Sequence, residues 1–446
     1  MRRLRSAAAI ALLLVAPAAF ADWLEPDASY RDAQLLLRQA LRDTLGHGGE
    51  PARLDTLGVA QLRLGRFDDA RTVFGRVLAA DPRDAAAAAA FGKLALFGDR
   101  LGEADSLLSA AAAAGEAGAL PDLYATRLRR GEWARAAEMA PQVNDQGRVP
   151  MLEWLAEHPP YRITAGPDEV KVPWSKGYPV PLMRVKLNGH SVLMALDTGT
   201  RDLLIDQSAA RVCQIHMLSL KSLAFWGGSR LPAQNAIVQR LELGGLRIED
   251  LPAGVIGLRK WSLQVNPQDE PVAGIIGLGL LRALTPTIDY QAQALELRRP
   301  GASYPAGPDA RRVPFEIWGE SELTVWGTLN GGRRMAMVVA TGIGGGVAAP
   351  TEVLAEVGVK PGKLSRALRG AGSMLQGRSW AGVTVPNVAV GPLLRDKVAG
   401  WSGALDPVEL WRHGVRRDAM LSHDFFRGER VTIDWDRHEL VVEGKD

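Results

Sequence analysis

One carboxylate stands in a sequence setting that suits acid–base chemistry. Asp197 follows the apolar run 193–196 and precedes Thr198, Gly199 and Thr200. An apolar strand would carry the carboxylate into a tight turn, where glycine adopts backbone geometry closed to other residues and the threonine hydroxyls fix the turn. A carboxylate held in this way beside a cleft can act as a general acid or base. Taken alone, the same residues would also suit an Asx-type turn without chemistry.

A second copy of this setting occurs later in the chain and lacks the acid. There, Ala340 takes the place of the aspartate and is followed by Thr341 and Gly342. A downstream element, 275–277, also recurs at 420–422. The distance from triplet to element is 277 − 197 = 80 residues in the first copy and 422 − 340 = 82 in the second. Paired landmarks at nearly equal spacing predict a duplicated unit.

Together these motifs resemble retropepsin-like and pepsin-like aspartic peptidases, over about residues 178 to 443. The segment 197–200 is similar to the active-site loop of that family, and 275–277 to the apolar-apolar-Gly element beneath the loop. The resemblance implies an all-β, two-lobed architecture, Asp197 as the catalytic carboxylate, and a peptide or protein substrate in the cleft. It also implies a flap, formed by Phe225, Trp226, Gly227 and Gly228.

The family chemistry uses two carboxylates, which share one proton because two Asp side chains about 3 Å apart cannot both be ionised. Ala340 removes the second carboxylate. Three outcomes stay open. Two chains could pair their Asp197 side chains, Asp424 or Asp202 could substitute, or the cleft could bind extended peptide without cutting it. Hydrolysis of peptide bonds is the favoured function, and non-catalytic peptide or protein binding is the alternative.

Residues 28 to 145 predict an all-α domain, because they are rich in Ala, Leu, Arg and Glu and poor in β-branched residues. Two sets of residues share the spacing of a tetratricopeptide repeat. They are Leu54, Leu57, Gly58, Gly65, Ala70, Phe74 and Pro82, then Phe91, Gly92, Ala104 and Leu108. A weaker third copy begins near Gly131. The region resembles an array of about three helical hairpins, and a generic Ala-rich bundle is the alternative.

The fold class expected for the chain is therefore a multidomain one, an all-α helical repeat domain followed by an all-β, two-lobed, pepsin-like (tandem retropepsin-like) barrel pair. The amino-acid composition changes near Gly166, where Pro, Gly, Val and Trp become more frequent, and a Pro/Gly-rich stretch lies near 299–308. These two places give the expected boundaries. The expected segments are a signal peptide at 1–21, the helical domain at 28–145, a first lobe at 166–300 and a second, degenerate lobe at 309–446.

The first residues are typical of a bacterial secretory signal peptide. A basic start at Arg2, Arg3 and Arg5 leads into the apolar run 7–16 and a small-residue cut site ending at Ala21. The run is shorter than the roughly 18 apolar residues that a membrane anchor needs. We expect cleavage after Ala21, a periplasmic or otherwise exported protein, and no transmembrane span in the mature chain.

Composition narrows the choice of partners and cofactors. Removal of the leader would leave 53 − 3 = 50 Lys and Arg against 50 Asp and Glu, so no strong basic field favours nucleic acid. Cys213 is the single cysteine, and the seven histidines are scattered, so we expect no disulfide, metal or other cofactor. We expect His413 and His423 at the surface or in loops. The helical repeats offer a surface for a protein partner.

Overall fold

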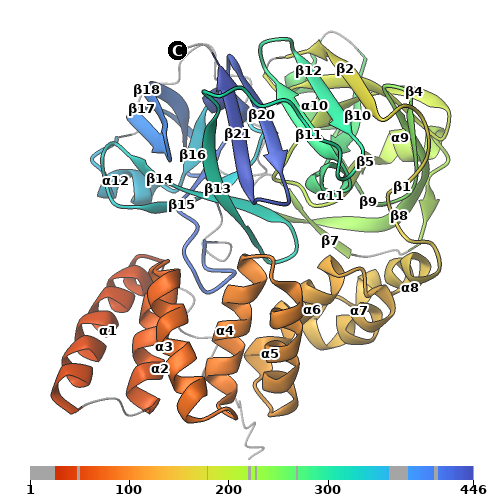
Figure 1. Cartoon of the computed structure of the whole chain (residues 1–446). Coiled ribbons are helices and arrows are strands. Elements are labelled where there is room, and N and C mark those ends of the chain that lie inside the picture. The colour runs from red at the N-terminus through yellow and green to blue at the C-terminus, as the bar shows by residue number, and fades with distance from the viewer. Residues whose placement is uncertain are drawn as a thin grey trace, which may run out of the picture.

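The computed structural model describes residues 26–47, 51–177, 179–218, 222–226, 229–267, 270–360, 380–405 and 410–444. The helices described N-terminal to the strands are α1 (Pro26–His47), α2 (Pro51–Arg63), α3 (Phe67–Ala80), α4 (Ala85–Phe97), α5 (Leu101–Ala113), α6 (Leu120–Arg129), α7 (Trp133–Met139) and α8 (Val149–Glu157). The prediction of a helical region ahead of a β region is confirmed (Figure 1). The helices continue to Glu157, beyond the predicted end at 145. The predicted signal peptide lies outside the described residues.

The strands fill the rest of the described chain. They are β1 (Arg162–Ala165), β2 (Glu169–Lys176), β3 (Leu182–Leu187), β4 (His190–Leu196), β5 (Leu203–Asp206), β6 (His216–Met217), β7 (Ser222–Trp226), β8 (Ser229–Leu243), β9 (Leu246–Ile256), β10 (Val272–Ile276), β11 (Thr285–Asp289), β12 (Ala294–Arg298), β13 (Arg311–Trp318), β14 (Glu322–Leu329), β15 (Met335–Val339), β16 (Val347–Ala349), β17 (Ala381–Val390), β18 (Leu393–Ser402), β19 (Ala419–Leu421), β20 (Glu429–Asp434) and β21 (Glu439–Gly444). Short helices α9 (Gln207–Val212), α10 (Arg259–Val265), α11 (Leu278–Arg282) and α12 (Thr351–Glu356) lie among them.

The helices pack as antiparallel neighbours through matched small and large residues. A carbon added at Gly58 would lie 2.7 Å from the Phe74 ring, and one added at Gly92 would lie 2.7 Å from Leu108. Each glycine therefore lets the following helix approach closely. The two contacts repeat at 92 − 58 = 34 and 108 − 74 = 34 residues, the spacing on which the tetratricopeptide prediction was based. No helix in the described ranges has the length and hydropathy of a membrane-spanning segment.

A six-stranded antiparallel sheet joins the two halves of the β region, with the strand order β2-β12-β11-β20-β21-β13. Its centre is the pair β11 and β20, where Thr287 lies opposite Thr432 and their hydroxyls are 2.8 Å apart. The order is therefore symmetric about this pair. We call β2 to β12 (169–298) the first unit and β13 to β21 (311–444) the second unit.

Several strand pairings outside this sheet recur in both units. In the first unit β4 pairs with β3 and, in parallel, with β10, which also pairs with β5. In the second unit β15 pairs with β14 and, in parallel, with β19, which also pairs with β16. The long hairpins β8–β9 and β17–β18 correspond as well. The duplication inferred from spaced sequence landmarks thus has a counterpart in the pairing of the strands.

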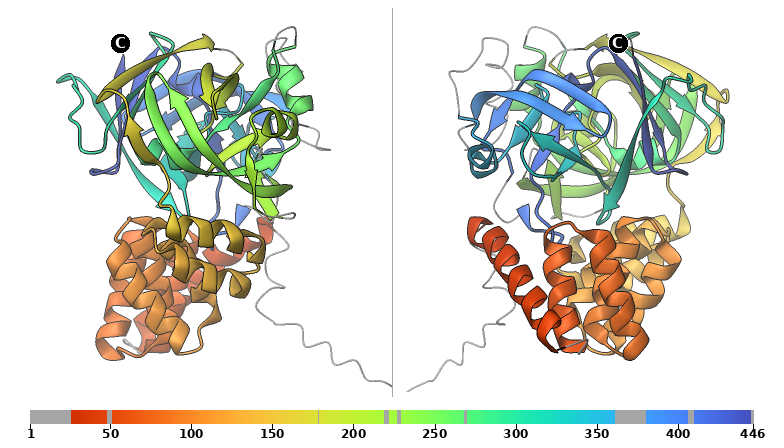
Figure 2. Two further views of the ribbon diagram at one scale, coloured as in Figure 1. Left: turned by 90° about the vertical axis from the view of Figure 1, so that its right-hand side faces the viewer. Right: turned by 60° about the vertical axis from the view of Figure 1, so that its left-hand side comes forward.

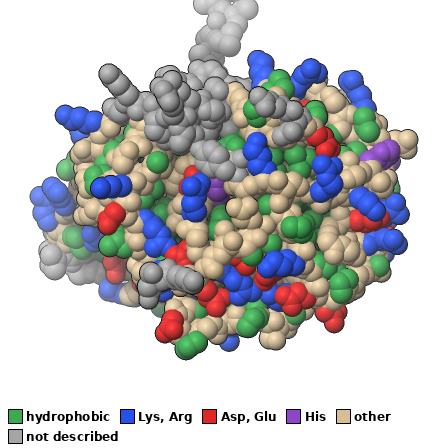
Figure 3. Space-filling model, turned by 90° about the horizontal axis from the view of Figure 1, so that it is seen from above, with side chains coloured by type: hydrophobic (Ala, Val, Ile, Leu, Met, Phe, Trp, Pro, Cys, Tyr) green, Lys and Arg blue, Asp and Glu red, His purple; other side chains and the backbone are tan. Residues whose placement is uncertain are grey.

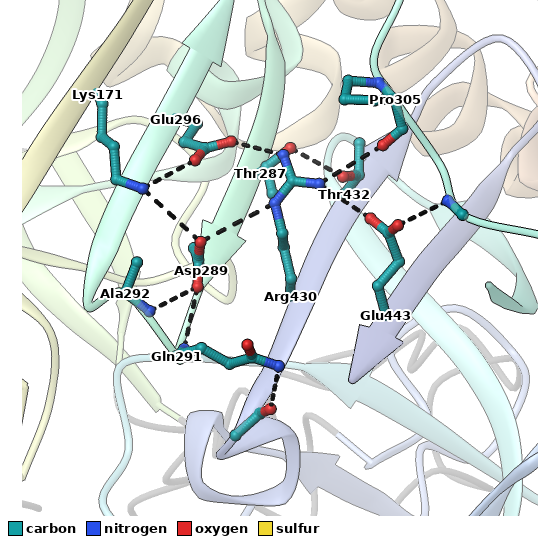
Figure 4. A network of polar contacts seen from close by, with 12 residues as sticks. Lys171, Thr287, Asp289, Gln291, Ala292, Glu296, Pro305, Arg430, Thr432 and Glu443 are labelled. Carbon is teal, nitrogen blue, oxygen red and sulfur yellow. Dashed lines mark hydrogen bonds and ion pairs between the residues drawn. The ribbon is translucent and has the colours of Figure 1, made fainter. Parts of the chain in front are cut away.

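A polar network covers the middle of the six-stranded sheet (Figure 4). Arg430 on β20 donates to Glu296 on β12 (2.7 Å) and to Glu443 on β21 (3.0 Å). Lys171 on β2 also donates to Glu296 (3.1 Å). Burial on its own would raise the pKa of Glu296, but these donors and Arg298 lower it to about 2. Because the cations come from both units, the network fastens the units together at neutral pH.

The helical region forms a layer against one end of the β region, away from the C-terminus (Figures 1 and 2). Trp318, at the end of β13, is fully buried there and stacks on Phe97 of α4 with ring centroids 5.1 Å apart. The Asp99 carboxylate receives hydrogen bonds from Arg129 of α6 and from Arg282 of α11 (2.8 Å). Apolar burial and shared ion pairs therefore fix the helical region in place. On the opposite face, seen from above in Figure 3, basic and acidic side chains are interspersed.

Candidate functional site

Strand β4 carries Asp197 into the interior of the β region. The strand is buried from Val192 to Leu196 because it lies between β3 and β10. The Asp197 amide donates to the carbonyl of Ile276 at the end of β10 (3.0 Å), and the residue is only 5% exposed. Its counterpart Ala340 follows β15 and donates to Leu421 in the same way (2.8 Å). The two triplets thus leave equivalent strands.

Three donors hold the Asp197 carboxylate. Oδ1 accepts from the backbone amides of Gly199 (2.8 Å) and Gly342 (2.9 Å). Oδ2 accepts from the hydroxyl of Thr200 (2.9 Å). The Gly342 amide belongs to the second unit, so the carboxylate is oriented by both halves of the β region.

Hydrogen bonds between Thr198 and Thr341 join the two triplet loops face to face. The Thr198 hydroxyl donates to the carbonyl of Val339 (2.7 Å), and the Thr198 amide donates to the Thr341 hydroxyl (3.0 Å). The converse bonds run from the Thr341 amide to the Thr198 hydroxyl (3.3 Å) and from the Thr341 hydroxyl to the carbonyl of Leu196 (3.4 Å). Since each loop supplies the same groups, the junction has approximate two-fold symmetry.

Ala340 occupies the position where that symmetry would place a second acid. A carbon added at Gly199 would lie 2.6 Å from the Ala340 Cβ, and one added at Gly342 would lie 2.6 Å from the Asp197 Cβ. Each of these side chains therefore sits over the glycine of the opposite loop. Among the described residues, no second carboxylate is hydrogen-bonded to Asp197.

The two acids considered as substitutes have other partners. Asp202 accepts from Arg201 (2.7 Å) and from the Tyr161 hydroxyl (3.3 Å). Asp424 accepts from the Gly345 amide (3.1 Å) and from Arg427 (2.5 Å). Neither contacts the Asp197 carboxylate, so the structure does not bring these sequence-derived candidates together with it.

Burial raises the pKa of Asp197 above its usual range, although the bonds from Gly199, Gly342 and Thr200 act in the opposite direction. Below the pKa that Asp197 has in the unfolded chain, the carboxyl is protonated in both states, so folding does not bury a charge. Between that pKa and the raised pKa of the folded state only the unfolded chain releases the proton, so stability falls as the pH rises, and the loss is complete above the raised pKa. The carboxyl of Asp197 thus stays protonated to a higher pH than that of an ordinary aspartate.

We expect Asp197→Asn to stabilise the fold at neutral pH, because an amide fills the same space without a buried charge. The gain in free energy of unfolding should amount to about 1.4 kcal/mol for each unit of the pKa rise. It should shrink to nothing near pH 3. Thermal unfolding of both proteins at several pH values measures the difference, and Asp309→Asn in the linker between the units serves as the control. A variant less stable than the parent at pH 7 would show that ionised Asp197 stabilises the fold.

The element 275–277 lies directly beneath the Asp197 loop, where only glycine fits at its end. A carbon added at Gly277 would lie 2.2 Å from the carbonyl oxygen of Asp202 and 2.7 Å from that of Thr200. In the second unit Ser422 stands here, and its hydroxyl donates to the carbonyl of Ile343. The loop that has lost its acid is therefore tied down by a side chain instead of a close backbone approach.

Both histidines expected at the surface or in loops lie between strands, but neither is at the surface. His423 is buried beside the second triplet loop, with Nδ1 3.2 Å from the carbonyl oxygen of Ile343. His413 is also buried and lies 3.2 Å from Glu322. The His423 ring faces Tyr290 of the first unit, and the His413 ring faces Phe97 of the helical region. Local sequence carries no sign of either contact.

The predicted flap coincides with a hairpin. Strand β7 pairs antiparallel with β8, and the pairing reaches Trp226 opposite Ser229. Gly227 and Gly228, at the tip, lie outside the described residues. At the base of the hairpin Leu223 is 53% exposed, which leaves an apolar side chain available beside the cleft.

A cavity of about 730 Å³ opens beside the Asp197 loop and was not expected from the sequence. One wall comes from the first unit, including Gly199, Thr200 and the base of β7. The other walls come from the segment 143–148 of the helical region and from the turn 319–322 of the second unit. Its volume is within the range of small-ligand pockets. The helical region is thus part of the same concave site as the Asp197 loop.

An ion network crosses this cavity. Oε2 of Glu320, in the β13–β14 turn, accepts from Arg148 of the helical region (2.9 Å) and from Arg201 of the Asp197 loop (2.6 Å). Burial on its own would raise the pKa of Glu320, but Arg201, Arg148 and Arg412 hold it well below the usual range. Glu320 is therefore ionised and links three parts of the chain that are distant in sequence.

Comparison with known proteins finds a protein family that matches part of the first unit. A family model described as aspartyl protease matches residues 183–280, which include Asp197 and the 275–277 element. A comparison with curated proteins found no match. Among solved structures, the crystal structure of basic 7S globulin from soybean is similar, with a TM-score of 0.39 and 10% sequence identity. The similarity covers 64% of this chain and 96% of that chain. The matched segment of the first unit is thus aspartyl-protease-like.

Proposed function

We propose that the β region is a two-lobed, aspartic-peptidase-like module that binds an extended polypeptide at the Asp197 loop, and that a single chain lacks the paired carboxylates for hydrolysis. The observation that carries this proposal is the junction of the two triplet loops, where Asp197 and Ala340 hold equivalent positions over opposite glycines. The two loops are placed as they would be for a pair of acids, but only one of the two positions carries a carboxyl group.

Paired-acid hydrolysis needs two carboxyl groups in different protonation states, and a single chain presents, among its described residues, only one at this site. That chemistry needs one carboxylate to take a proton from water while the other donates to the peptide carbonyl. Asp197 can do one of these at a time, and no other described acid is bonded to it. A dimer that paired two Asp197 side chains would first have to break the buried bonds between Thr198 and Thr341. We therefore rank dimer formation below binding.

The case for peptide binding comes from the hairpin beside the loop. Among the described residues β7 forms strand pairs with β8 alone, so its other edge has no strand partner and could receive main-chain hydrogen bonds from an added strand. Exposed Leu223 offers apolar contact to alternate side chains of such a strand. Binding by strand addition requires no acid pair.

Hydrolysis with Asp197 as the catalytic carboxylate is the second candidate. It is favoured by the aspartyl-protease match across this residue and by burial, which raises the pKa of Asp197 and so favours its protonated form. In that case a base outside the described residues, or a second chain, would have to activate the water. Turnover that requires Asp197 would support this candidate over pure binding.

For the remainder of the chain we propose the arrangement inferred from the sequence. Residues 1–21 would be a cleaved signal peptide, which makes the mature protein an exported one. The helices from residue 28 on would be tetratricopeptide-like hairpins, supported by the repeated Gly58–Phe74 and Gly92–Leu108 contacts. Mass spectrometry of protein from the extracytoplasmic fraction would reveal whether the chain begins at Asp22.

We expect Leu223→Asp to weaken peptide binding by about 10-fold or more, because a charge on the open hairpin must be desolvated on strand addition. The measurement is fluorescence anisotropy with a labelled, mixed-sequence hexapeptide library and the mature full chain. Leu394→Asp is the matched control, since Leu394 is a 58% exposed strand leucine on β18, outside the cavity lining. Equal affinities for both variants and the parent would contradict binding at β7.

A further inference from the structure

The cavity beside the Asp197 loop continues the proposed peptide site. Gly199 and Thr200, which hold the Asp197 carboxylate, also line the cavity, as does Leu223 on β7. Asn235 of β8 donates to the carbonyl of Gly147 (2.8 Å) and so fixes the helical region at this wall. A peptide lying along β7 past the Asp197 loop would meet side chains of the helical region next.

Two guanidinium groups, one buried and one partly exposed, converge in this cavity on one acceptor atom. Arg148, 4% exposed, and Arg201 each donate through Nη1 to Oε2 of Glu320. Arg148 also reaches Asp145 through Nη1 (3.3 Å), and Arg201 reaches Asp202 through Nε (2.7 Å). Among the described residues the Nη2 groups of both arginines have no hydrogen-bond acceptor. Each guanidinium therefore keeps donors for a further anion.

The acidic side chains of the lining are already engaged by cations of the protein. Asp122 pairs with Lys93 (3.3 Å), and Glu322 pairs with Arg417 (2.8 Å). Asp145, Asp202 and Glu320 pair with the two convergent arginines. A cationic ligand would have to displace one of these internal partners, whereas an anionic ligand would use donors that are unengaged.

We propose that this cavity is a subsite for a carboxylate of the bound peptide, held by Arg148 of the helical region and Arg201 of the Asp197 loop. The carboxylate comes either from the free C-terminus or from an Asp or Glu side chain, since both present the planar pair of oxygens that a guanidinium binds. The inference rests on the proposed peptide binding and adds its substrate class. It also makes the helical region a direct contributor to specificity.

The test uses the mature full chain and three forms of one mixed-sequence hexapeptide library. The first has free C-termini, the second has carboxamide termini, and the third has carboxamide termini with Asn and Gln in place of Asp and Glu. We expect the third form to bind about 10-fold or more weakly than the first. If the second form binds like the first, side-chain carboxylates are the source, and if it binds like the third, the C-terminus is the source.

Variants connect the effect to the two arginines. Arg201→Gln should remove the preference for carboxylate-bearing peptides, and Arg148→Gln should do the same. Since Arg148 is buried and its variant can fail to fold, the more exposed Arg201 keeps the test valid. Arg135→Gln, at an exposed position of α7 paired with Glu132, is the matched control and should keep the preference.

The results distinguish this inference from the function on which it rests. Equal binding of all three libraries, or tighter binding of lysine-rich peptides, overturns the carboxylate subsite while peptide binding stands. A preference that persists in Arg201→Gln overturns it as well. If no library binds while the protein is folded, both the proposed function and the subsite fall.

Discussion

Ala340→Asp is expected to turn the chain into an acid-active peptidase. Ala340 sits over Gly199 as Asp197 sits over Gly342, so the new carboxylate would lie beside the Gly199 amide. Ile343 stands where the first loop has Thr200, so no equivalent hydroxyl would hold the second oxygen. Two carboxyl groups about 3 Å apart share one proton, so one can act as the base and the other as the acid that hydrolysis needs. Cleavage of the hexapeptide library should exceed the background signal of the inert parent by about 10²–10⁴-fold, with an optimum below neutral pH.

The controls separate chemistry from altered binding. Ala340→Asn adds a side chain of similar size without an acid and should leave the protein inert. Asp197→Asn in the Ala340→Asp background should abolish the new activity, since the pair would again hold one acid. Activity in the Asn variant, or no activity in a folded Asp variant that binds peptide, would contradict the equivalence of the two positions.

Trp318→Ala is expected to loosen the helical region from the β region. The indole is fully buried, stacks on Phe97 and lies 5.9 Å from Phe67 by ring centroids. Removing it leaves a cavity between α3, α4 and β13, with a cost of about 3–5 kcal/mol in free energy of unfolding. Because the helical region forms a wall of the peptide site, affinity for peptide should fall as well.

Denaturant unfolding measures this effect through two signals. Far-UV circular dichroism reports on the helices, and tryptophan fluorescence reports mainly on the β region, where nine of the twelve tryptophans lie. In Trp318→Ala the helical signal should change at a lower denaturant concentration than the fluorescence. Trp261→Ala, a buried tryptophan in a core cluster of the first unit, is the matched control and should lower stability without separating the two signals. Coincident transitions in Trp318→Ala would mean that other contacts dominate the interface.

The sequence was informative where chemistry and spacing coincide in short segments. Asp197, the loss of the acid at Ala340 and the duplicated landmarks all lie in local motifs, and strands pair around them as the duplication predicts. The helical region was recognisable from composition and from small residues such as Gly58 and Gly92. Whether Asp197 is catalytic stays a prediction, as do the export signal and the segment boundaries.

The rest depended on contacts between distant segments. Arg148 and Glu320 are 320 − 148 = 172 residues apart, and nothing in either neighbourhood indicates that they meet. The cavity exists because the helical region docks on the cleft side of the β region, which single-sequence patterns do not encode. The burial of His423 was missed for the same reason, since its ring faces Tyr290 of the other unit.

The most direct measurement is incubation of the mature wild-type chain with the free-carboxylate hexapeptide library from about pH 3 to pH 8, with bound peptide and new peptide termini quantified together. We expect saturable binding and no new termini at any pH, because one chain presents one carboxylate where two are needed. Cleavage by the wild-type protein that disappears in Asp197→Asn would contradict this and establish a catalytic aspartate.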